Sequence, residues 1–335
     1  MILKPLLFAF SALFIAGTSA HAQTPIIIKF SHVVAQDTPK GKGAQRFKEL
    51  AEKATNGRVK VEVYPNSQLY KDKEELEALQ LGAVQMLAPS LSKFGPLGIK
   101  EFEVYDLPYI LPSKAALTRV NQGPIGKALF KKLEVRGITG LAFWDNGFKV
   151  MSANKPMKSP ADFKGMKMRI QSSKVLDEQM RALGANPQVM AFSEVYQALQ
   201  TGVVDGGENT PSNIYSQKMH EVQSHLTVSN HGYIGYAVIT NKKFWDSLPA
   251  DIRTALDGAM KEATLYANTI SQEENDAALD AIRKTGKTEV HMMTAQEKLE
   301  WRKALLPVQA KMEGRIGKEL IADFNREAAA ADAGK

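Results

Sequence analysis

Apolar and polar residues alternate along the chain with a period that switches repeatedly between that of a strand and that of a helix. The segment 59–64, VKVEVY, alternates with a period of two, as a half-buried strand does. It lies between predicted helices at 37–57 and 71–84, whose apolar residues recur at three- and four-residue spacing. This strand–helix rhythm predicts an α/β fold in which helices cover largely parallel sheets.

The same rhythm places the remaining elements. Further strands are predicted at 24–33, 85–90, 137–144, 148–156 and 166–171, and further helices at 113–121, 124–134, 176–183 and 193–202. From 249 to 286 the chain keeps helical spacing, with no proline after the first residue. At 1.5 Å per residue this helix would be roughly 50 Å long, which is longer than one small domain is wide. We therefore expect it to bridge two lobes.

The first 22 residues have the pattern of a secretory signal peptide. Lys4 supplies the positive start, an apolar run extends from Leu6 to Gly17, and Ala20 and Ala22 are the small residues before the cleavage point. The run is shorter than the ~20 residues that a membrane-spanning helix needs, so an uncleaved anchor is disfavoured. The sequence therefore predicts export to the periplasm and cleavage near Ala22.

The remaining chain is longer than most single cores, so two lobes are expected. We assign 23–146 and 235–275 to a first lobe, and 147–234 and 276–335 to a second. No low-complexity linker separates these segments, which predicts that the chain crosses between the lobes several times.

Composition excludes several kinds of function. The chain has no cysteine, which rules out disulfides, thiolate metal sites and cysteine nucleophiles. Its formal net charge is +7, but acidic and basic residues are interleaved, so a nucleic-acid-binding surface is not indicated. No P-loop, dinucleotide-binding, G-x-S-x-G or H-E-x-x-H motif is present. We therefore predict no metal, no cofactor and no enzymatic activity.

Arg169 is the strongest candidate for binding chemistry. It lies near the end of a predicted strand and, by alternation, points away from the face that carries Met166, Met168 and Ile170. Ligands of open α/β sheets bind beyond the carboxyl ends of the strands, and a guanidinium group matches a carboxylate with two parallel hydrogen bonds. The residues alone leave two interpretations open, a ligand anchor or a structural salt bridge. Lys149 starts another strand-like segment in a similar way.

Four segments resemble the solute-binding proteins of tripartite ATP-independent periplasmic (TRAP) transporters, and most of all their dicarboxylate-binding branch. They are FSHVVAQDTPKG (30–41), DLPYIL (106–111), WDNGFKVMSANKPMKSPADFKGMKMRI (144–170) and AFSEVYQALQTGVVDGGENTPSN (191–213). The resemblance covers nearly all of the chain after the predicted signal peptide. It implies a two-lobed clamshell of the periplasmic-binding-protein type, with mixed, mostly parallel sheets and a long helix that bridges the lobes.

The resemblance also implies which residues form the site. Arg169 would grip a ligand carboxylate, Asn209 would supply a second polar contact, and Phe192 would form a wall of the pocket. Many relatives have an arginine where this chain has Lys149, and lysine keeps the charge but loses the bidentate fork. Further contacts are expected from His32, Lys40, Asp72 and Ser90 in the first lobe and from Tyr236 near a lobe crossover.

The expected function is capture of a small organic acid for a sodium-driven TRAP permease that has a small and a large membrane subunit. The two cationic residues Arg169 and Lys149 suggest a four-carbon dicarboxylate such as malate, succinate or fumarate. A keto or aromatic monocarboxylate is the first alternative. Two others are an exported enzyme that acts on organic acids, and a binding component of an ATP-driven importer or chemoreceptor.

Overall fold

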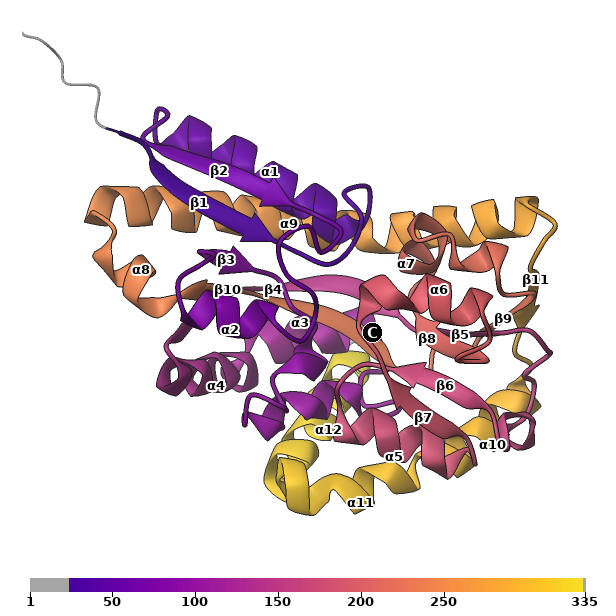
Figure 1. Cartoon of the computed structure of the whole chain (residues 1–335). Helices are drawn as coiled ribbons and strands as arrows, with labels where there is room; N and C mark the ends of the chain where they lie inside the picture. Colours follow the sequence, from indigo (N-terminus) through magenta and orange to yellow (C-terminus); the bar gives the residue numbers. More distant parts are fainter. Residues whose placement is uncertain (1–23, 334–335) are drawn as a thin grey trace, which may run out of the picture.

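Two mixed β-sheets, one in each lobe, organise the fold in the computed structural model, which describes residues 24–333 (Figure 1). The predicted signal peptide lies outside the described residues. The first sheet has the order β2 (Val59–Tyr64), β1 (Ile26–Ser31), β3 (Met86–Leu87), β10 (Tyr233–Asn241), β4 (Ile138–Phe148). The second has the order β11 (Glu289–Met292), β9 (His225–Val228), β5 (Val150–Ala153), β8 (Gly206–Asn209), β6 (Lys167–Ile170), β7 (Asn186–Val189). The predicted two-lobed α/β fold is confirmed.

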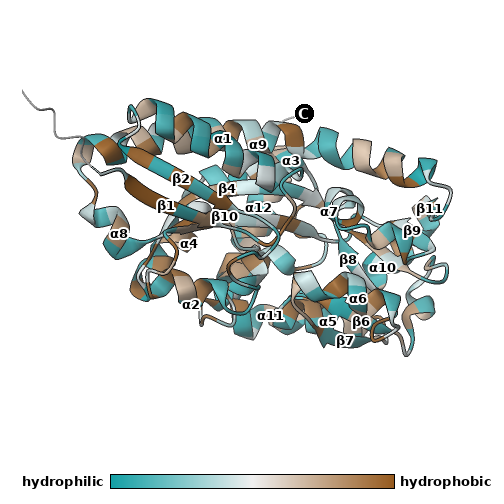
Figure 2. Ribbon diagram, turned by 45° about the horizontal axis from the view of Figure 1, so that its top comes forward, coloured by the Kyte–Doolittle hydropathy of each residue, from teal (hydrophilic) through white to brown (hydrophobic). Residues whose placement is uncertain are grey.

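Helices cover both sheets, as the alternating sequence pattern requires. They are α1 (Pro39–Ala54), α2 (Glu75–Gln80), α3 (Lys114–Gln122), α4 (Pro124–Leu133), α5 (Lys174–Ala182), α6 (Val195–Gln200), α7 (Pro211–Ser216), α8 (Lys242–Ser247), α9 (Ala250–Lys284), α10 (Ala295–Leu305), α11 (Pro307–Ile316) and α12 (Lys318–Ala333). Figure 2 shows hydrophobic residues on strands β1 and β2 and mixed colours along α1 and α9, as expected for amphipathic helices on a sheet. Within 24–333, no helix is both long and apolar enough to cross a membrane.

The strands next to the edge strands β2 and β7 pair in the same way in the two lobes. β1 pairs in parallel with β2 and β3, and β6 pairs in parallel with β7 and β8. The same side-chain bond recurs beside each: Lys29 N donates to Gln85 Oε1 at 3.0 Å, and Lys167 N donates to Asp205 Oδ2 at 2.7 Å. The loops that follow β2 and β7, at 65–74 and 190–194, therefore occupy equivalent positions. Both leave the carboxyl end of an edge strand and lead into a short helix.

Helix α9 joins the lobes, as its sequence pattern predicts. It packs on α1 and β4 in the first lobe and on α7 in the second, and it extends across both lobes in Figure 1. Its buried stripe is apolar from Ile252 to Ala267, becomes polar at Ser271 and Asn275, and returns to Ala278 and Ile282. The polar positions lie where the chain crosses between the lobes.

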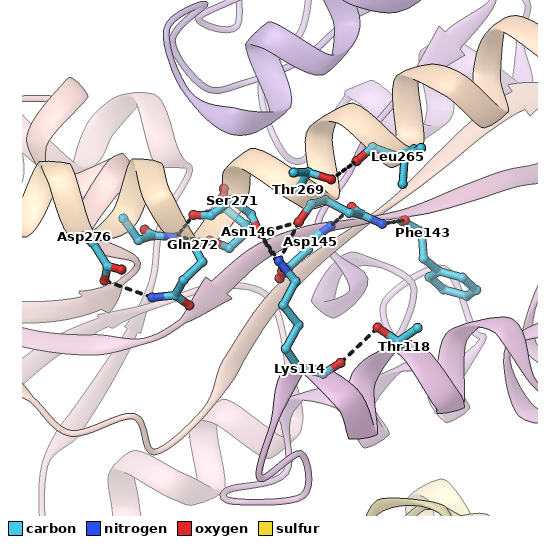
Figure 3. Close-up of polar contacts among 12 residues, drawn as sticks. Lys114, Thr118, Phe143, Asp145, Asn146, Leu265, Thr269, Ser271, Gln272 and Asp276 are labelled. Atoms are coloured by element: carbon cyan, nitrogen blue, oxygen red, sulfur yellow. Dashed lines mark hydrogen bonds and ion pairs between the residues drawn. The ribbon is translucent and has the colours of Figure 1, made fainter. Parts of the chain in front are cut away.

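Those polar side chains bind the crossover between β4 and β5. Ser271 Oγ donates to Asp145 Oδ2 at 2.6 Å (Figure 3). Asn275 Nδ2 donates to Asn146 O at 2.6 Å, while Asn275 Oδ1 accepts from a backbone N–H of α7 at 3.0 Å. The long helix therefore holds both lobes at their junction.

The C-terminal helices pack across the sequence-based lobe division. Helix α12 lies on α3 and α4, and α11 contacts α5 together with the 3-10 helix η2 (Lys100–Asp106). The division from sequence assigned 276–335 to the second lobe. Because α12 buries Phe324 and Ile321 in the same apolar cluster as α3 and α4, we propose that 318–333 belongs with the first lobe.

Candidate functional site

A cavity of about 300 Å³ lies between the two lobes, and its lining includes residues at or just after the carboxyl ends of β1 and β6. It is lined by Val33, Val34, Lys40, Asp72, Ser90, Lys93, Arg169, Gln171, Phe192, Asn209, Asn213, Ile234 and Tyr236. Seven of the nine sequence-predicted site residues are in this lining, and Lys149 and His32 are not. The two lobes thus contribute polar groups to one cavity.

A larger hollow of about 1160 Å³ lies on the outer surface between α1 and α9. None of the predicted site residues lines it, and one of its lining residues, Leu265, is 71% exposed. The inner cavity is the better candidate site because its charged side chains are buried, which is costly unless they serve a partner.

Arg169 projects into the cavity from the end of β6. Its Nε and Nη2 donate to Met190 O at 3.1 and 2.8 Å, and its guanidinium carbon lies 5.9 Å from the centre of the Phe192 ring. These bonds use two of the five N–H donors of a guanidinium group, so others remain for a carboxylate. Burial lowers the pKa of Arg169, and Asp72 and Glu208 oppose this. Asp72 and Glu208 are ion-paired with Lys93 and Lys149, so neither acid forms a salt bridge with Arg169.

Asn209 ends β8 beside Arg169 and is oriented by its neighbours. Its Oδ1 accepts from Thr210 N and from Asn213 Nδ2, both at 2.9 Å. Its NH₂ group is then the donor that remains for an acceptor in the cavity. Asn213 Nδ2 also lies 3.3 Å from Tyr236 Oη, which connects this amide pair to the first-lobe sheet.

Lys40 supplies a buried cation from the first lobe. It is 1% exposed, its Nζ donates to Ala88 O at 3.0 Å, and it lies 3.7 Å over the centre of the Tyr236 ring. Burial and the nearby Lys93 cation lower the pKa of Lys40 to about 7, and neighbouring acids oppose this only in part. A ligand carboxylate at this place would favour the charged form.

Lys93 is the second buried cation of the first lobe, but its charge is already balanced. Its Nζ forms ion pairs with Asp72 and with Glu75, the latter at 2.5 Å. These two acids raise its pKa against the effect of burial. Among the cavity cations, Lys40 and Arg169 are therefore the ones whose charge a ligand can match.

The structure places Lys149 away from the cavity lining. It is completely buried, and its Nζ is ion-paired with Glu208 Oε1 at 2.7 Å. His231 Nε2 and Gln179 Nε2 contact Glu208 Oε2 at 2.8 and 3.1 Å. Burial would raise the pKa of Glu208, but Lys149 and His231 outweigh it and lower the pKa to about 2. The expected second anchor is thus committed to an acid within its own lobe.

His32 also lies outside the cavity lining, and it is completely buried. Burial and the neighbouring Lys40 cation lower its pKa to about 3, so the ring is neutral. The lining residues that were not singled out from the sequence include Gln171, Asn213 and Lys93. Gln171 directly follows β6, so the strand-end argument that selected Arg169 could have found it. Nothing in the sequence indicates Lys93.

A small cavity between two lobes, with an available cation on each wall, defines a binding protein for a small anion. The comparisons give the family: the chain belongs to family 7 of the bacterial extracellular solute-binding proteins, whose model matches residues 30–315. This confirms the resemblance to TRAP solute-binding proteins.

Individual relatives cover most of the chain. It is 70% identical over 298 residues to the C4-dicarboxylate-binding periplasmic protein DctP of Rhodobacter capsulatus, covering 89% of this chain and 90% of that one. A TRAP periplasmic solute binding protein from Shewanella oneidensis with bound succinate has a TM-score of 0.89 and 44% identity, covering 91% of this chain and all of that chain. One from Pseudomonas aeruginosa PAO1 with bound L-malate has a TM-score of 0.84 and 43% identity, covering 86% and 100%.

Proposed function

We propose that this protein captures a four-carbon dicarboxylate such as succinate, malate or fumarate and delivers it to a TRAP permease. The observation that carries the proposal is the presence of two buried cations, Arg169 and Lys40, on opposite lobes of one cavity, for which residues 24–333 provide no ion-paired acid. Relatives with 43% and 44% identity hold L-malate and succinate, which supports the same class of ligand.

The site can bind a diacid through contacts at both ends. Arg169 takes one carboxylate with its free N–H groups, and the Asn209 NH₂ group donates to a neighbouring oxygen. Lys40 donates to the second carboxylate, while Phe192 and Tyr236 cover the carbon chain. The cavity is small, which favours a compact acid.

Closure of the lobes makes this binding selective. Exclusion of water lowers the local dielectric and strengthens both charge pairs. It also leaves any unmatched polar group buried, at a cost of roughly 1–3 kcal/mol, and more if it is charged. A monocarboxylate, the alternative ligand class, would leave the Lys40 cation without a partner.

The wider setting follows from the family. We propose that the signal peptide is cleaved near Ala22 and that the mature protein works in the periplasm. There it would hand the acid to the small and large membrane subunits of a sodium-driven permease. It would act by binding alone, without a catalytic step, a metal or a cofactor.

The test is a thermal-shift and calorimetric screen that pairs succinate with butyrate, its monocarboxylate counterpart. Succinate should raise the melting temperature of the wild type far more than butyrate does, because ligand binding to the folded state stabilises it. Arg169→Ala should abolish both shifts, and Lys40→Met should bring the succinate shift down to that of butyrate. Lys100→Met, an exposed lysine, is the matched control. A keto or aromatic monoacid that binds tighter than every diacid would refute the proposal.

A further inference from the structure

The two equivalent loops of the lobes meet beside the cavity. Lys71 in the loop 65–74 forms an ion pair at 3.0 Å with Glu194 of the second lobe. Glu194 is the last residue of the 3-10 helix η5 (Phe192–Glu194). Next to it, Asp72 Oδ2 accepts a hydrogen bond from Phe192 N. The first of these contacts is half-exposed and the second lines the cavity, so together they run from the surface to the ligand space.

Asp72 has a partner for each of its carboxylate oxygens. Oδ1 is ion-paired with Lys93 and Oδ2 accepts from Phe192 N. Burial would raise its pKa, but Lys93, Arg169 and the backbone N–H outweigh it and lower the pKa to about 2. The carboxylate of Asp72 therefore stays ionised, and both of its oxygens already have partners in the protein. This differs from the ligand contact that the family resemblance implied.

The segment that Asp72 reaches is also bound from its own side. Met190 O accepts two hydrogen bonds from Arg169, and Phe192 N, two residues on, donates to Asp72 of the opposite lobe. The segment 190–192 is thus held between the ligand-binding guanidinium group and the first lobe. It also carries the Phe192 ring that forms a cavity wall.

We propose that Asp72 is a positioning residue that ties the first lobe to the segment 190–192 and holds the cleft closed around the ligand, with the Lys71–Glu194 ion pair as an outer support. Contacts between loops of different lobes exist only when the lobes are together. They therefore slow the release of ligand and leave its entry into the open cleft unchanged. That the enclosed ligand is an organic acid rests on the proposed function, whereas the contribution of Asp72 to closure does not.

The experiment compares Asp72→Ala with Lys73→Ala, an exposed neighbour in the same loop. Stopped-flow kinetics with succinate should show dissociation about ten- to hundredfold faster in Asp72→Ala, the range expected for a hydrogen bond to a charged group. Association should stay within about threefold of wild type, because electrostatic steering alone changes in the open state. An equal effect in both variants, or a loss confined to association, would overturn the proposal.

The distance between spin labels on the two lobes reports whether the lobes are closed, even without a ligand. The chain has no cysteine, so Lys60→Cys and Lys155→Cys, one exposed site in each lobe, would carry the only spin labels. Asp72→Ala should shift the population from the short to the long interlobe distance relative to Lys73→Ala. If wild type and Asp72→Ala have the same distances with and without succinate, the closure role is wrong.

The two proposals fail in different ways. Wild type that binds neither succinate nor L-malate contradicts the dicarboxylate function, while the ligand-free distances still test Asp72. A second variant guards against a folding defect: Lys71→Glu should speed release a few-fold, and adding Glu194→Lys should restore it, because the exposed pair is simply reversed. Absence of this rescue removes the outer ion pair from the closure contact.

Discussion

Binding of a dicarboxylate should take up a proton at Lys40. In the ligand-free protein, burial and Lys93 lower the pKa of Lys40 from 10.5 to about 7. A carboxylate placed against its Nζ favours the charged form and raises that pKa again. From a pKa of about 7, binding should take up about a quarter of a proton at pH 6.5 and nearly one at pH 8.5.

The sign of the pH dependence follows from this uptake. Below pH 7 Lys40 is already charged, so affinity depends little on pH. Above pH 7 each binding event must first protonate the amine, so affinity should fall by up to about tenfold per pH unit. Of the other charged groups around it, Asp72 has a pKa of about 2 and His32 of about 3, and the pKa of Lys93 is raised. Burial also raises the pKa of Glu75, which Lys93 and Lys40 oppose, so the Lys40→Met variant is needed to assign the proton uptake to Lys40.

Calorimetry in buffers of different ionisation enthalpy measures the proton uptake directly. The observed binding enthalpy of succinate, plotted against buffer ionisation enthalpy, should have a slope near one at pH 8.5 and a much smaller slope at pH 6.5. Lys40→Met should remove the slope at both pH values, and Lys100→Met should keep it. A slope of zero for the wild type at pH 8.5, or an unchanged slope in Lys40→Met, would refute the assignment of Lys40 as the second anchor.

Three further predictions concern stability. Lys40→Met should raise the unfolding free energy of the ligand-free protein by a few kcal/mol below pH 7, with the gain shrinking as pH rises from 7 to 10.5, because a lowered lysine pKa penalises the folded state most where the amine is charged. Glu208→Gln should cost about 3–5 kcal/mol in urea unfolding, since it leaves the buried Lys149 cation unpaired. Gly147→Ala should destabilise more than Gly57→Ala: both have positive φ, 117° and 75°, but only at Gly147 would the Cβ meet a side-chain atom, 2.6 Å away.

Each of these has a clear contrary result. An unfolding free energy of Lys40→Met that never exceeds that of wild type would show that the buried amine carries no charging penalty. A loss below 1 kcal/mol for Glu208→Gln would mean that water or another group takes over the Lys149 ion pair. Equal effects of the two glycine variants would indicate that Asn275 of α9 can move away from the added Cβ at 147 at little cost.

Local pattern was sufficient to locate part of the site. Arg169 lies near the end of a predicted strand, and ligands of open α/β sheets bind beyond the carboxyl ends of the strands. Asn209 was expected from the family resemblance and from a tight turn after two glycines, whereas the structure places it at the end of β8. The long helix α9 was also predictable, because helical spacing persists from 249 to 286 with no proline after the first residue. These features depend on periodicity and on the direction of strands, which are encoded over short distances.

The distinction between Lys149 and Lys40 could not be read in the same way. Whether a buried lysine is available depends on which acid lies beside it, and Glu208 reaches Lys149 from 59 residues away through the pairing of β5 with β8. In the same way, nothing in the sequence around Asp72 shows that its carboxylate accepts a hydrogen bond from the backbone N–H of Phe192 across the cleft. The first contact depends on the register of strand pairing, and the second depends on how the two lobes come together.

The pairing of charges around the cavity leads to a further consequence for selectivity. Lys93 and Lys149 are each matched by acids, which leaves two cations for the ligand and so favours a dianion. A monoacid avoids the cost of an unmatched Lys40 when that amine is neutral, which happens as pH rises above about 7. The affinity ratio of succinate to butyrate should therefore fall by up to about tenfold per pH unit between pH 7 and 8.5. Calorimetric competition at pH 6.5 and 8.5 measures this ratio. A ratio that stays constant would mean that the second carboxylate is recognised by groups that do not titrate, and Lys40 would lose its role in choosing the ligand.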